Sequence, residues 1–448
     1  MSFPRYPAYK DSGVEWLGEV PSHWHVSALK REYSVTLGKM LQTDASSPED
    51  VLGPYLRAAN IQWSGVDASD IKTMWLSGRD VLQLRLLPGD LLISEGGDVG
   101  RSCLWQGELE ECYFQNSVNR VRPINGGSSR FLYYWMSTIK DKGYVDVLCN
   151  KSTIAHFTAE KVAAVPVPIP PNGEQESIAH FLNIETAKID ALVAEQEQLI
   201  TLLKEKRQAV ISHAVTKGLD PSVPMKDSGV EWLGVVPAHW QVRRVKDVTR
   251  LESGHTPSKT VPEYWVDCDI PWVSLNDSKY LAANDYITDT AVQINQLGIE
   301  NSSARLLPAG SVVFTRDATI GLAAITTREM AVSQHLIAWC PTGLMDPLYL
   351  LRVFNAMRGH LDSYTFGATI KTIGMGDVKS LTTPVPPHDE QVAIATFLGN
   401  ELQVLDQLVD EAFLSTELLR ERRTALISAA VTGQIDVRGL APAQEQAA

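Results

Sequence analysis

KDSGVEWLGEVPSHW at residues 10–24 returns as KDSGVEWLGVVPAHW at residues 226–240, 216 positions further along the chain. Repeats of solenoids and arrays are only about 20–50 residues long, so this spacing indicates two similar domains rather than a stacked array. The same spacing is kept by two later pairs of segments, which are VPIPP (167–171) with TPVPP (383–387) and AVISHAVT (209–216) with ALISAAVT (425–432). The sequence therefore predicts an internal duplication of about half the chain.

The interiors of the two halves, residues 31–150 and 247–365, are barely alike in sequence. One short similarity remains between them, because LLPGDLLIS at 86–94 corresponds to LLPAGSVVFT at 306–315. Such short apolar runs, interrupted by glycine and aspartate, are typical of strands. We expect both interiors to be compact mixed α/β domains that share a fold and differ in surface chemistry.

Two long segments without internal proline predict helices over residues 174–216 and 390–432. A proline pair precedes each segment, which suits the start of a helix, and Gly218 and Gly433 follow, as glycine often does at a helix end. At 1.5 Å per residue each helix would be about 64 Å long.

Each predicted helix carries one apolar stripe, which indicates that it packs against a partner helix. The other copy is the obvious partner. An antiparallel pair would place the two domains at opposite ends, and we favour it over a parallel pair, which would place both at one end. The residues predicted to form the seam follow heptad spacing: Leu192, Leu199, Leu203 and Val210 in the first helix, and Leu408, Leu419 and Leu426 in the second.

Length and composition restrict the class of protein. A chain of 448 residues is too long for one compact core, which predicts two or three domains. No apolar run approaches the roughly 18 residues of a membrane span. The N-terminus lacks a signal-peptide core, and the five cysteines have neither metal-binding nor disulfide spacing, so we expect a cytoplasmic protein. The net charge of −13 requires that any DNA contact use basic residues gathered on one face, or partners that supply them.

No catalytic motif is present in the sequence. GHTPSKT at 254–260 lacks the glycine that precedes the lysine of a phosphate-binding loop, and there is no HExxH, GxSxG or GxGxxG. The histidines are scattered, and no group of His, Cys or Asp has the spacing of metal ligands. We therefore predict no catalytic residues and no metal site, and favour a binding or architectural role.

Taken together, these segments resemble the specificity (S) subunit of type I restriction–modification systems. The resemblance covers nearly the whole chain. It is carried by the KDSGVEWLGEVPSHW passage, SGHTPSK at 253–259, PPNGEQ at 170–175, PPHDEQ at 386–391 and RRTALISAAVTGQID at 422–436.

The resemblance implies an α+β fold with a pseudo-twofold internal repeat. Two similar mixed α/β target-recognition domains would be joined by two long helices that form an antiparallel coiled-coil spacer. The implied divisions are target-recognition domain 1 at 1–172, spacer helix 1 at 173–218, target-recognition domain 2 at 219–388, spacer helix 2 at 389–433 and a disordered tail at 434–448.

The resemblance also implies a non-catalytic reader of double-stranded DNA. Each domain would read one half of a bipartite, asymmetric target, and the spacer would set the gap and dock methyltransferase (M) subunits, expected to be two. Restriction (R) subunits would complete the complex. No cofactor is expected in this chain, because S-adenosylmethionine, ATP and Mg²⁺ would be bound by the partner subunits.

Two other readings remain open at this point. One is a stand-alone or regulatory DNA-binding protein that needs no methyltransferase partner. The other is a nuclease or methyltransferase that carries recognition domains of this kind, although the missing motifs speak against it.

Candidate DNA-contacting residues were chosen by residue type, because arginine and lysine suit phosphate and guanine, and asparagine suits adenine. For each residue the alternative to a DNA contact is a structural role, such as a turn, a surface ion pair or buried packing. The candidates are Gly254, Thr256, Ser258 and Lys259 in a donor-rich loop, Arg316 and Arg101 after predicted strands, Lys371 beside a repeated Thr-Ile dipeptide, Arg57, Asn60 and Asn276 near aromatic residues, Arg120 and Arg122 on one strand face, and Lys30, Arg243 and Arg244 after the His-Trp pairs.

Overall fold

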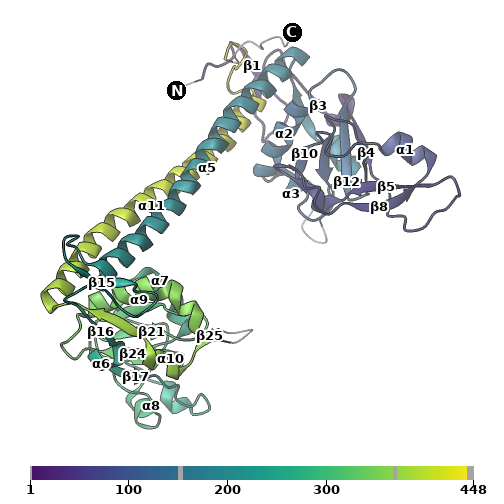
Figure 1. The fold of residues 1–448 in the computed structure, drawn as a ribbon. Coiled ribbons are helices and arrows are strands. Elements are labelled where there is room, and N and C mark those ends of the chain that lie inside the picture. Colours follow the sequence, from purple (N-terminus) through teal and green to yellow (C-terminus); the bar gives the residue numbers. More distant parts are fainter. Residues whose placement is uncertain (1–2, 150–154, 367–370, 441–448) are drawn as a thin grey trace. The chain divides into compact units, whose positions relative to one another are not determined.

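The computed structural model describes residues 3–149, 155–366 and 371–440. The chain forms two compact units (Figure 1). Unit 1 comprises Met1–Gln196 with Leu414–Ala448, and unit 2 comprises Glu197–Phe413. Both boundaries fall inside the two long helices, whereas the divisions expected from the sequence lie at the helix ends.

Two sheets form the centre of unit 1. The first is antiparallel with the strand order β10-β9-β12-β4, and the second has the order β11-β5-β8, with β11 parallel to β5. Helix α2 packs on the first sheet, where Phe131 and Trp135 are fully buried. The elements are β1 Tyr9–Asp11, β2 Glu19–Pro21, β3 His25–Ala28, β4 Tyr33–Leu37, β5 Val51–Leu56, β6 Ile61–Gln62, β7 Gly65–Val66, β8 Lys72–Leu76, α1 Gly78–Leu84, β9 Leu91–Ser94, β10 Ser102–Leu104, β11 Tyr113–Phe114, β12 Val118–Pro123, α2 Ser129–Asp141, α3 Tyr144–Leu148, α4 Ala159–Ala164, β13 Pro166–Ile169 and α5 Asn172–Lys217.

Unit 2 is built in the same way. Its larger sheet has the order β17-β24-β21-β22-β19, and its smaller sheet has the order β20-β18-β23. Helix α9 covers the larger sheet, and Trp339 and Phe354 pack together between them. The elements are β14 Met225–Asp227, β15 Val235–Pro237, β16 Gln241–Arg244, α6 Val245–Val248, β17 Arg250–Ser253, β18 Ile270–Val273, α7 Ser278–Ala283, β19 Tyr286–Ile287, β20 Gln293–Ile294, α8 Gln296–Glu300, β21 Val312–Thr315, β22 Ala323–Thr326, β23 Ala331–Val332, β24 Leu336–Cys340, α9 Pro347–Leu361, β25 Thr365–Phe366, β26 Thr372–Ile373, α10 Met375–Ser380, β27 Thr382–Val385 and α11 His388–Val431.

The shared topology confirms that the divergent interiors have one fold. The order β4-β12-β9-β10 of unit 1 corresponds to β17-β24-β21-β22 of unit 2. In both units a strand of the smaller sheet pairs in parallel, β11 with β5 and β23 with β18. The strands predicted from LLPGDLLIS and LLPAGSVVFT are β9 and β21.

A glycine at the same place in each interior allows two backbone segments to cross. A Cβ on Gly38 would lie 2.2 Å from the carbonyl oxygen of Gln115, and a Cβ on Gly254 would lie 2.0 Å from that of Ser333. Gly38 and Gly254 are 216 positions apart, as in the rest of the duplication. Only glycine fits such a close backbone approach.

The repeated opening passage forms a small hairpin in each unit, β1–β2 and β14–β15. Its last residue, Trp24 or Trp240, is fully buried. The glycine that ends a long helix lies against each ring: a Cβ on Gly433 would lie 3.2 Å from Trp24, and a Cβ on Gly218 the same distance from Trp240. Both glycines have positive φ, which is typical of a helix C-terminus.

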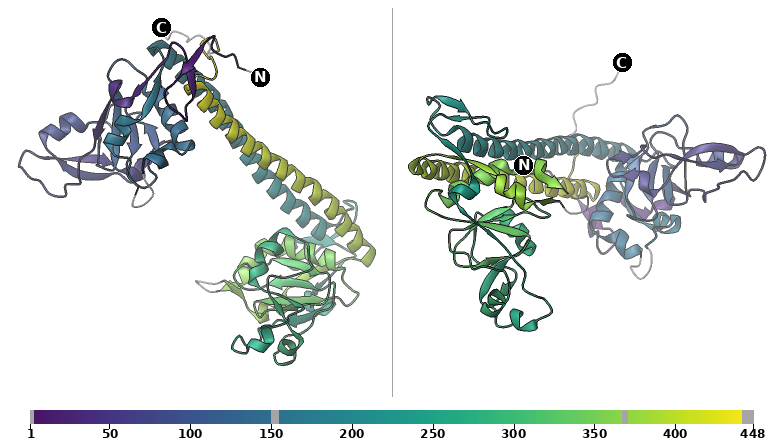
Figure 2. Two further views of the ribbon diagram at one scale, coloured as in Figure 1. Left: turned by 180° about the vertical axis from the view of Figure 1, so that it is seen from behind. Right: turned by 60° about the horizontal axis from the view of Figure 1, so that its bottom comes forward.

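Helices α5 and α11 lie side by side in each unit (Figures 1 and 2). In unit 1 the first half of α5 packs against the last half of α11, where Arg423 Nε donates to Asp190 Oδ1 at 2.7 Å. In unit 2 the last half of α5 packs against the first half of α11, where Arg207 Nε donates to Asp406 Oδ1 at 3.0 Å. The pairing is therefore antiparallel, as predicted, and each unit holds a copy of the same ion pair.

Four of the predicted seam residues face the partner helix or the core. Leu203 and Leu426 are buried, with 8% and 7% of their surface exposed. Val210 and Leu419 are partly buried and pack on the cores of unit 2 and unit 1 respectively.

The prediction is wrong for Leu192, Leu199 and Leu408, which are 45%, 42% and 42% exposed. In each case the next residue is less exposed and falls on the heptad spacing of the buried positions. Those neighbours are Val193, Ile200 and Val409.

The predicted disorder at 434–448 is wrong for residues 434–440, and residues 441–448 lie outside the described part. Val437 is fully buried in the core of unit 1. The backbone N–H of Asp436 donates to Pro4 O at 2.8 Å, and the guanidinium of Arg438 lies 4.9 Å from the ring centre of Tyr6.

Candidate nucleic-acid interface

Three segments of unit 2 that are distant in sequence meet where β21 ends. Backbone hydrogen bonds join them: Arg316 N donates to His335 O at 3.0 Å, Ile373 N to Arg316 O at 2.9 Å, and Ala318 N to Lys371 O at 2.9 Å. The structure therefore brings two predicted residues, Arg316 and Lys371, to one edge of the domain.

The side chains at this edge form a short polar chain. His335 Nδ1 lies 2.7 Å from Asp317 Oδ2, while Arg316 Nε lies 3.7 Å from Asp317 Oδ1, which is too far for a hydrogen bond. Within the described residues Arg316 Nε has no hydrogen-bond acceptor. Ala318 has a φ of 61°, a left-handed value that is uncommon outside glycine and is found at functional turns. The backbone of Arg316 is thus fixed by two hydrogen bonds, while its guanidinium makes only a loose ion pair with Asp317.

The matching edge of unit 1 has different side chains on the same frame. Glu95 N donates to Ser117 O and Phe157 N to Glu95 O, both at 2.9 Å, and Arg101 Nη2 donates to Ala58 O at 3.1 Å. Burial raises the pKa of Glu95, an effect that nearby His156 opposes. Arg101 is partly exposed here, and its contact with DNA stays a prediction. Residues 150–154, which come just before this edge in sequence, are outside the described residues.

A pocket of about 520 Å³ in unit 2 is lined by two further candidate DNA-contacting residues. Lys259 and Asn276 line it together with Trp265 and Trp272, whose rings meet edge to face 5.6 Å apart. Lys259 and Asn276 are exposed. Aromatic faces beside amide and ammonium donors match the chemistry of nucleobases.

Thr256 and Ser258 belong to the same loop as Lys259. Thr256 is partly buried, and exposed Ser258 has its hydroxyl 2.8 Å from that of Thr260. Gly254 is partly buried, and the close approach of Ser333 O requires that it have no side chain, while its contact with DNA stays a prediction.

Two candidates in unit 1 are wrong because their side chains are buried and form their hydrogen bonds within the fold. Asn60 is 3% exposed, and its amide accepts from Arg57 N and donates to Asp67 O and Asp70 O. Arg120 is 6% exposed and donates to three oxygens, those of Gln83 O, Arg85 O and Thr36 Oγ1. Burial, with a smaller effect of Arg122, lowers the pKa of Arg120 to about 10.

Two other arginines are held by carboxylates. Arg122 pairs with Asp90 and also donates to Arg85 O at 2.9 Å, so it shares a strand face with Arg120, as predicted. Arg57 pairs with Asp70. The basic residues Lys30, Arg243 and Arg244 are exposed on the short segments that follow the His-Trp pairs.

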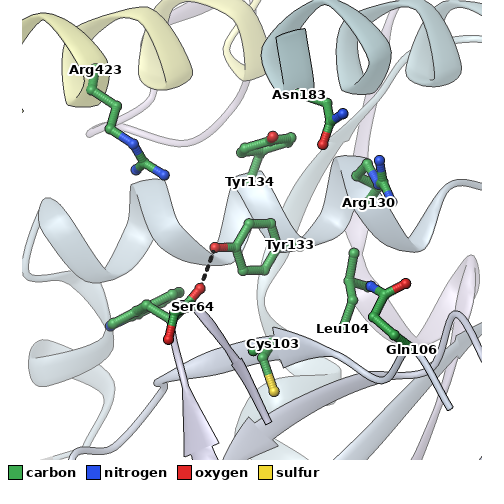
Figure 3. Close-up of a pocket in the computed structure, with 11 residues that line it drawn as sticks. Ser64, Cys103, Leu104, Gln106, Arg130, Tyr133, Tyr134, Asn183 and Arg423 are labelled. Carbon is green, nitrogen blue, oxygen red and sulfur yellow. Dashed lines mark hydrogen bonds between the residues drawn. The ribbon is translucent and has the colours of Figure 1, made fainter. Parts of the chain in front are cut away.

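A pocket of about 230 Å³ in unit 1 lies between the domain and the long helices (Figure 3). Tyr133 on α2 donates to Trp63 O at 2.9 Å, while Asn183 and Arg423 face it from α5 and α11. Arg423 is already paired with Asp190, and the pocket lies where α2 meets the long helices, so we assign it to domain–helix packing.

No pattern in the sequence points to His335 or Trp265 as site residues. Both become candidates only through the fold, which sets His335 against Asp317 and Trp265 beside Lys259. A histidine next to a strand and a tryptophan in a short turn are each too common to indicate a site.

The described residues also bear on metal binding, membrane insertion and thiol chemistry. Within them, no three His, Cys, Asp or Glu side chains converge in the manner of a metal site. Nor does any described helix have the length and apolar character that crossing a membrane requires. All five cysteines are free, and burial raises the pKa of the Cys103 and Cys112 thiols to about 12.

Comparison with known proteins gives matches across both units. The chain is 21% identical to the putative type I restriction enzyme MjaX specificity subunit of Methanocaldococcus jannaschii, over 94% of this chain and 96% of that one. It is 28% identical to the MjaIX specificity subunit of the same organism, over only 42% of this chain and 43% of that one.

Solved structures show the same fold. A chain from a study of complex assembly in the type I R-M system aligns with a TM-score of 0.71 at 14% identity, covering 92% of this chain and 98% of that one. The HsdS subunit of Thermoanaerobacter tengcongensis aligns with a TM-score of 0.56 at 15% identity, covering 93% and 98%. The family model for the type I restriction modification DNA specificity domain matches twice, at residues 83–202 and 237–407. The chain therefore belongs to the family of type I restriction–modification DNA specificity proteins.

Proposed function

We propose that the chain is the non-catalytic, DNA-reading specificity subunit of a type I restriction–modification complex. One observation carries the proposal: the two units share one frame but present different side chains at the matching edge. Unit 2 offers Arg316, His335 and Lys371 there, and unit 1 offers Arg101 and His156. A duplicated frame with different edges suits a bipartite, asymmetric target, with one half read by each unit.

The helices supply the spacer in this proposal. Their seam and the repeated Arg–Asp pair fix one register between α5 and α11 in each unit. A fixed register gives a fixed length of spacer, and hence a gap of fixed length in the DNA target.

Exposed apolar side chains on the helices support the docking of M subunits, which we expect to be two. In unit 2 these include Leu202, Val404 and Phe413, which are 52%, 54% and 60% exposed, and in unit 1 Leu414 and Leu418 are 59% and 55% exposed. Leu414 and Leu418 are about one turn apart and therefore lie on one face of α11, and a contiguous exposed apolar patch is typical of a surface that a partner covers.

The remaining chemistry is assigned to partners. M subunits would bind S-adenosylmethionine and methylate adenine, and R subunits would use ATP and Mg²⁺. Their surfaces would share the contact with DNA, which accommodates the net charge of −13. Because double-stranded DNA and these enzymes are its partners, the expected location is the cytoplasm.

Methylome sequencing of the source cell tests the proposal. We expect adenine methylation at one bipartite motif with a gap of constant length. A single continuous palindrome would contradict the proposal. Co-expression with M subunits provides the second test, because specific DNA binding by the chain alone would favour a stand-alone reader instead.

A matched pair of variants tests the division of reading between the units. Arg316→Ala is expected to relax specificity in one half of the motif and Arg101→Ala in the other. Loss of a guanine contact is worth about 1–3 kcal/mol, or roughly 5- to 150-fold in discrimination. If both variants relaxed the same half, the assignment of one half to each unit would be wrong.

A further inference from the structure

A buried carboxylate joins the repeated passage of unit 1 to the start of α5. Glu174 Oε1 accepts from Trp24 Nε1 at 2.9 Å and from the Tyr6 hydroxyl at 2.6 Å, while His23 Nε2 lies 2.8 Å from Glu174 Oε2. The side chain of Glu174 is only 6% exposed. All of its partners come from the first 24 residues of the chain.

Tyr6 closes this cluster from outside. Its ring centre lies 5.5 Å from that of His23 and 5.7 Å from that of Trp24, and Arg438 covers its outer face at 4.9 Å. Asp436 holds Arg438 in place by an ion pair of 2.6 Å. Burial, together with the hydrogen bond to Glu174, raises the pKa of Tyr6, so the phenol remains a proton donor.

Unit 2 repeats the cluster without its phenol. Glu390 accepts from Trp240 Nε1 at 2.8 Å and lies 2.8 Å from His239 Nε2. The residue 216 positions after Tyr6 is Ser222, whose hydroxyl bonds to Asp220 at 2.6 Å instead. The Glu390 side chain is consequently 43% exposed, against 6% for its counterpart.

An open cavity of about 290 Å³ lies beside this carboxylate. Its apolar wall includes Pro237, Ala393 and Ile394, the His239 ring lies beside them, and Glu390 stands at one side. Lys217 and Asp220 also line the cavity, but Lys217 Nζ already donates to Val235 O and Asp220 already accepts from the Ser222 hydroxyl. The cavity thus offers a histidine ring and a carboxylate acceptor, and Tyr6 meets the same pair of groups in unit 1.

We propose that this cavity binds a tyrosine side chain of a methyltransferase subunit, with the phenol donating to Glu390 as Tyr6 donates to Glu174. The inference rests on the proposed function for the identity of the partner. Tyrosine is favoured over phenylalanine, because only a phenol can supply the additional hydrogen bond that Tyr6 gives to Glu174 and that Glu390 lacks. It is favoured over arginine because the guanidinium in unit 1 stacks on the phenol rather than bonding to the carboxylate.

The first test uses small probes on the full chain. Saturation-transfer NMR with N-acetyltyrosinamide is expected to give a signal at least fivefold stronger than with N-acetylphenylalaninamide or N-acetylargininamide. Ala393→Trp, which fills the cavity from an exposed position, should abolish the difference. Ser177→Trp is the matched control at the equivalent place in unit 1, and it should leave the signal unchanged. Equal signals from the three probes would overturn the proposal, as would a signal that survives in Ala393→Trp.

The second test measures assembly with co-expressed methyltransferase subunits. Ala393→Trp is expected to weaken the complex about tenfold, and Ser177→Trp to leave it as in the wild type. If the wild-type chain binds no methyltransferase subunit, the proposed function itself is overturned. If wild type and Ala393→Trp bind equally well, only the tyrosine site is overturned.

Discussion

Replacing Gly254 by alanine is expected to destabilise unit 2, whereas the same change at Gly359 is expected to stabilise it. A Cβ at position 254 would lie 2.0 Å from Ser333 O, where ordinary contact begins at about 3.4 Å, so the two backbones must separate by more than 1 Å. That movement would strain the bonds from Gly254 N to Leu336 O (3.3 Å) and from His255 N to Val332 O (3.1 Å).

The expected effects have opposite signs. Forcing atoms into a packed site costs about 1–3 kcal/mol, and two weakened backbone hydrogen bonds add about 1 kcal/mol, so Gly254→Ala should lose about 3 kcal/mol. Gly359 lies in α9, and a Cβ there would meet nothing within 4 Å. Alanine has the higher helix propensity, so Gly359→Ala should gain about 0.5–1 kcal/mol.

Urea unfolding followed by tryptophan fluorescence measures both variants. Gly38→Ala provides a copy of the experiment in unit 1, because its Cβ would lie 2.2 Å from Gln115 O. The reasoning is refuted if Gly254→Ala unfolds at the same urea concentration as Gly359→Ala. If Gly254→Ala had wild-type stability but bound DNA more weakly, the result would instead indicate that Gly254 contacts DNA.

Three further outcomes are expected. Leu203→Ala should lower the free energy of unfolding by about 2–3 kcal/mol and Leu199→Ala by less than about 1 kcal/mol, because only Leu203 is buried in the seam. Thermal unfolding measures both, and equal losses would show that Leu199 also belongs to the seam. Arg207→Asp should cost about 0.5–1 kcal/mol, and the addition of Asp406→Arg should recover most of it in a double-mutant cycle; no recovery would show that the pair does not couple. A thiol reagent at pH 8 should modify the partly exposed Cys268 in the native protein and the four buried thiols only after unfolding; rapid reaction of all five would contradict their burial.

The fold could be predicted from the sequence because its main signals are long. A repeat at constant spacing and two long proline-free segments can be recognised even where the structure of single residues is ambiguous. The predicted seam position is wrong by one residue at Leu199, because Ile200 is also apolar. The sequence does not say which of two adjacent apolar residues faces inward.

The candidate site could be predicted only in part. Sequence reasoning places Arg316 and Lys371 among the candidates because cations near strand ends are common in DNA contacts, and the fold brings both to one edge of unit 2. Asn60 and Arg120 were chosen by residue type, but their hydrogen bonds are made to backbone oxygens brought near by folding. His335 and Trp265 could not be found, because each gains its role from neighbours far away in sequence.

The division of the chain has a consequence for its synthesis. Unit 2 is one continuous segment, whereas unit 1 is completed by residues after 413, including the buried Val431 and Val437. At about 5–20 residues per second, the ribosome needs on the order of tens of seconds to reach Val437 after residue 196. Unit 1 begins first and finishes last, so its apolar core stays incomplete until the last part of α11 and Val437 are made, while unit 2 can already fold. A nonsense mutation near residue 413 would therefore damage the first recognition domain made and spare the second.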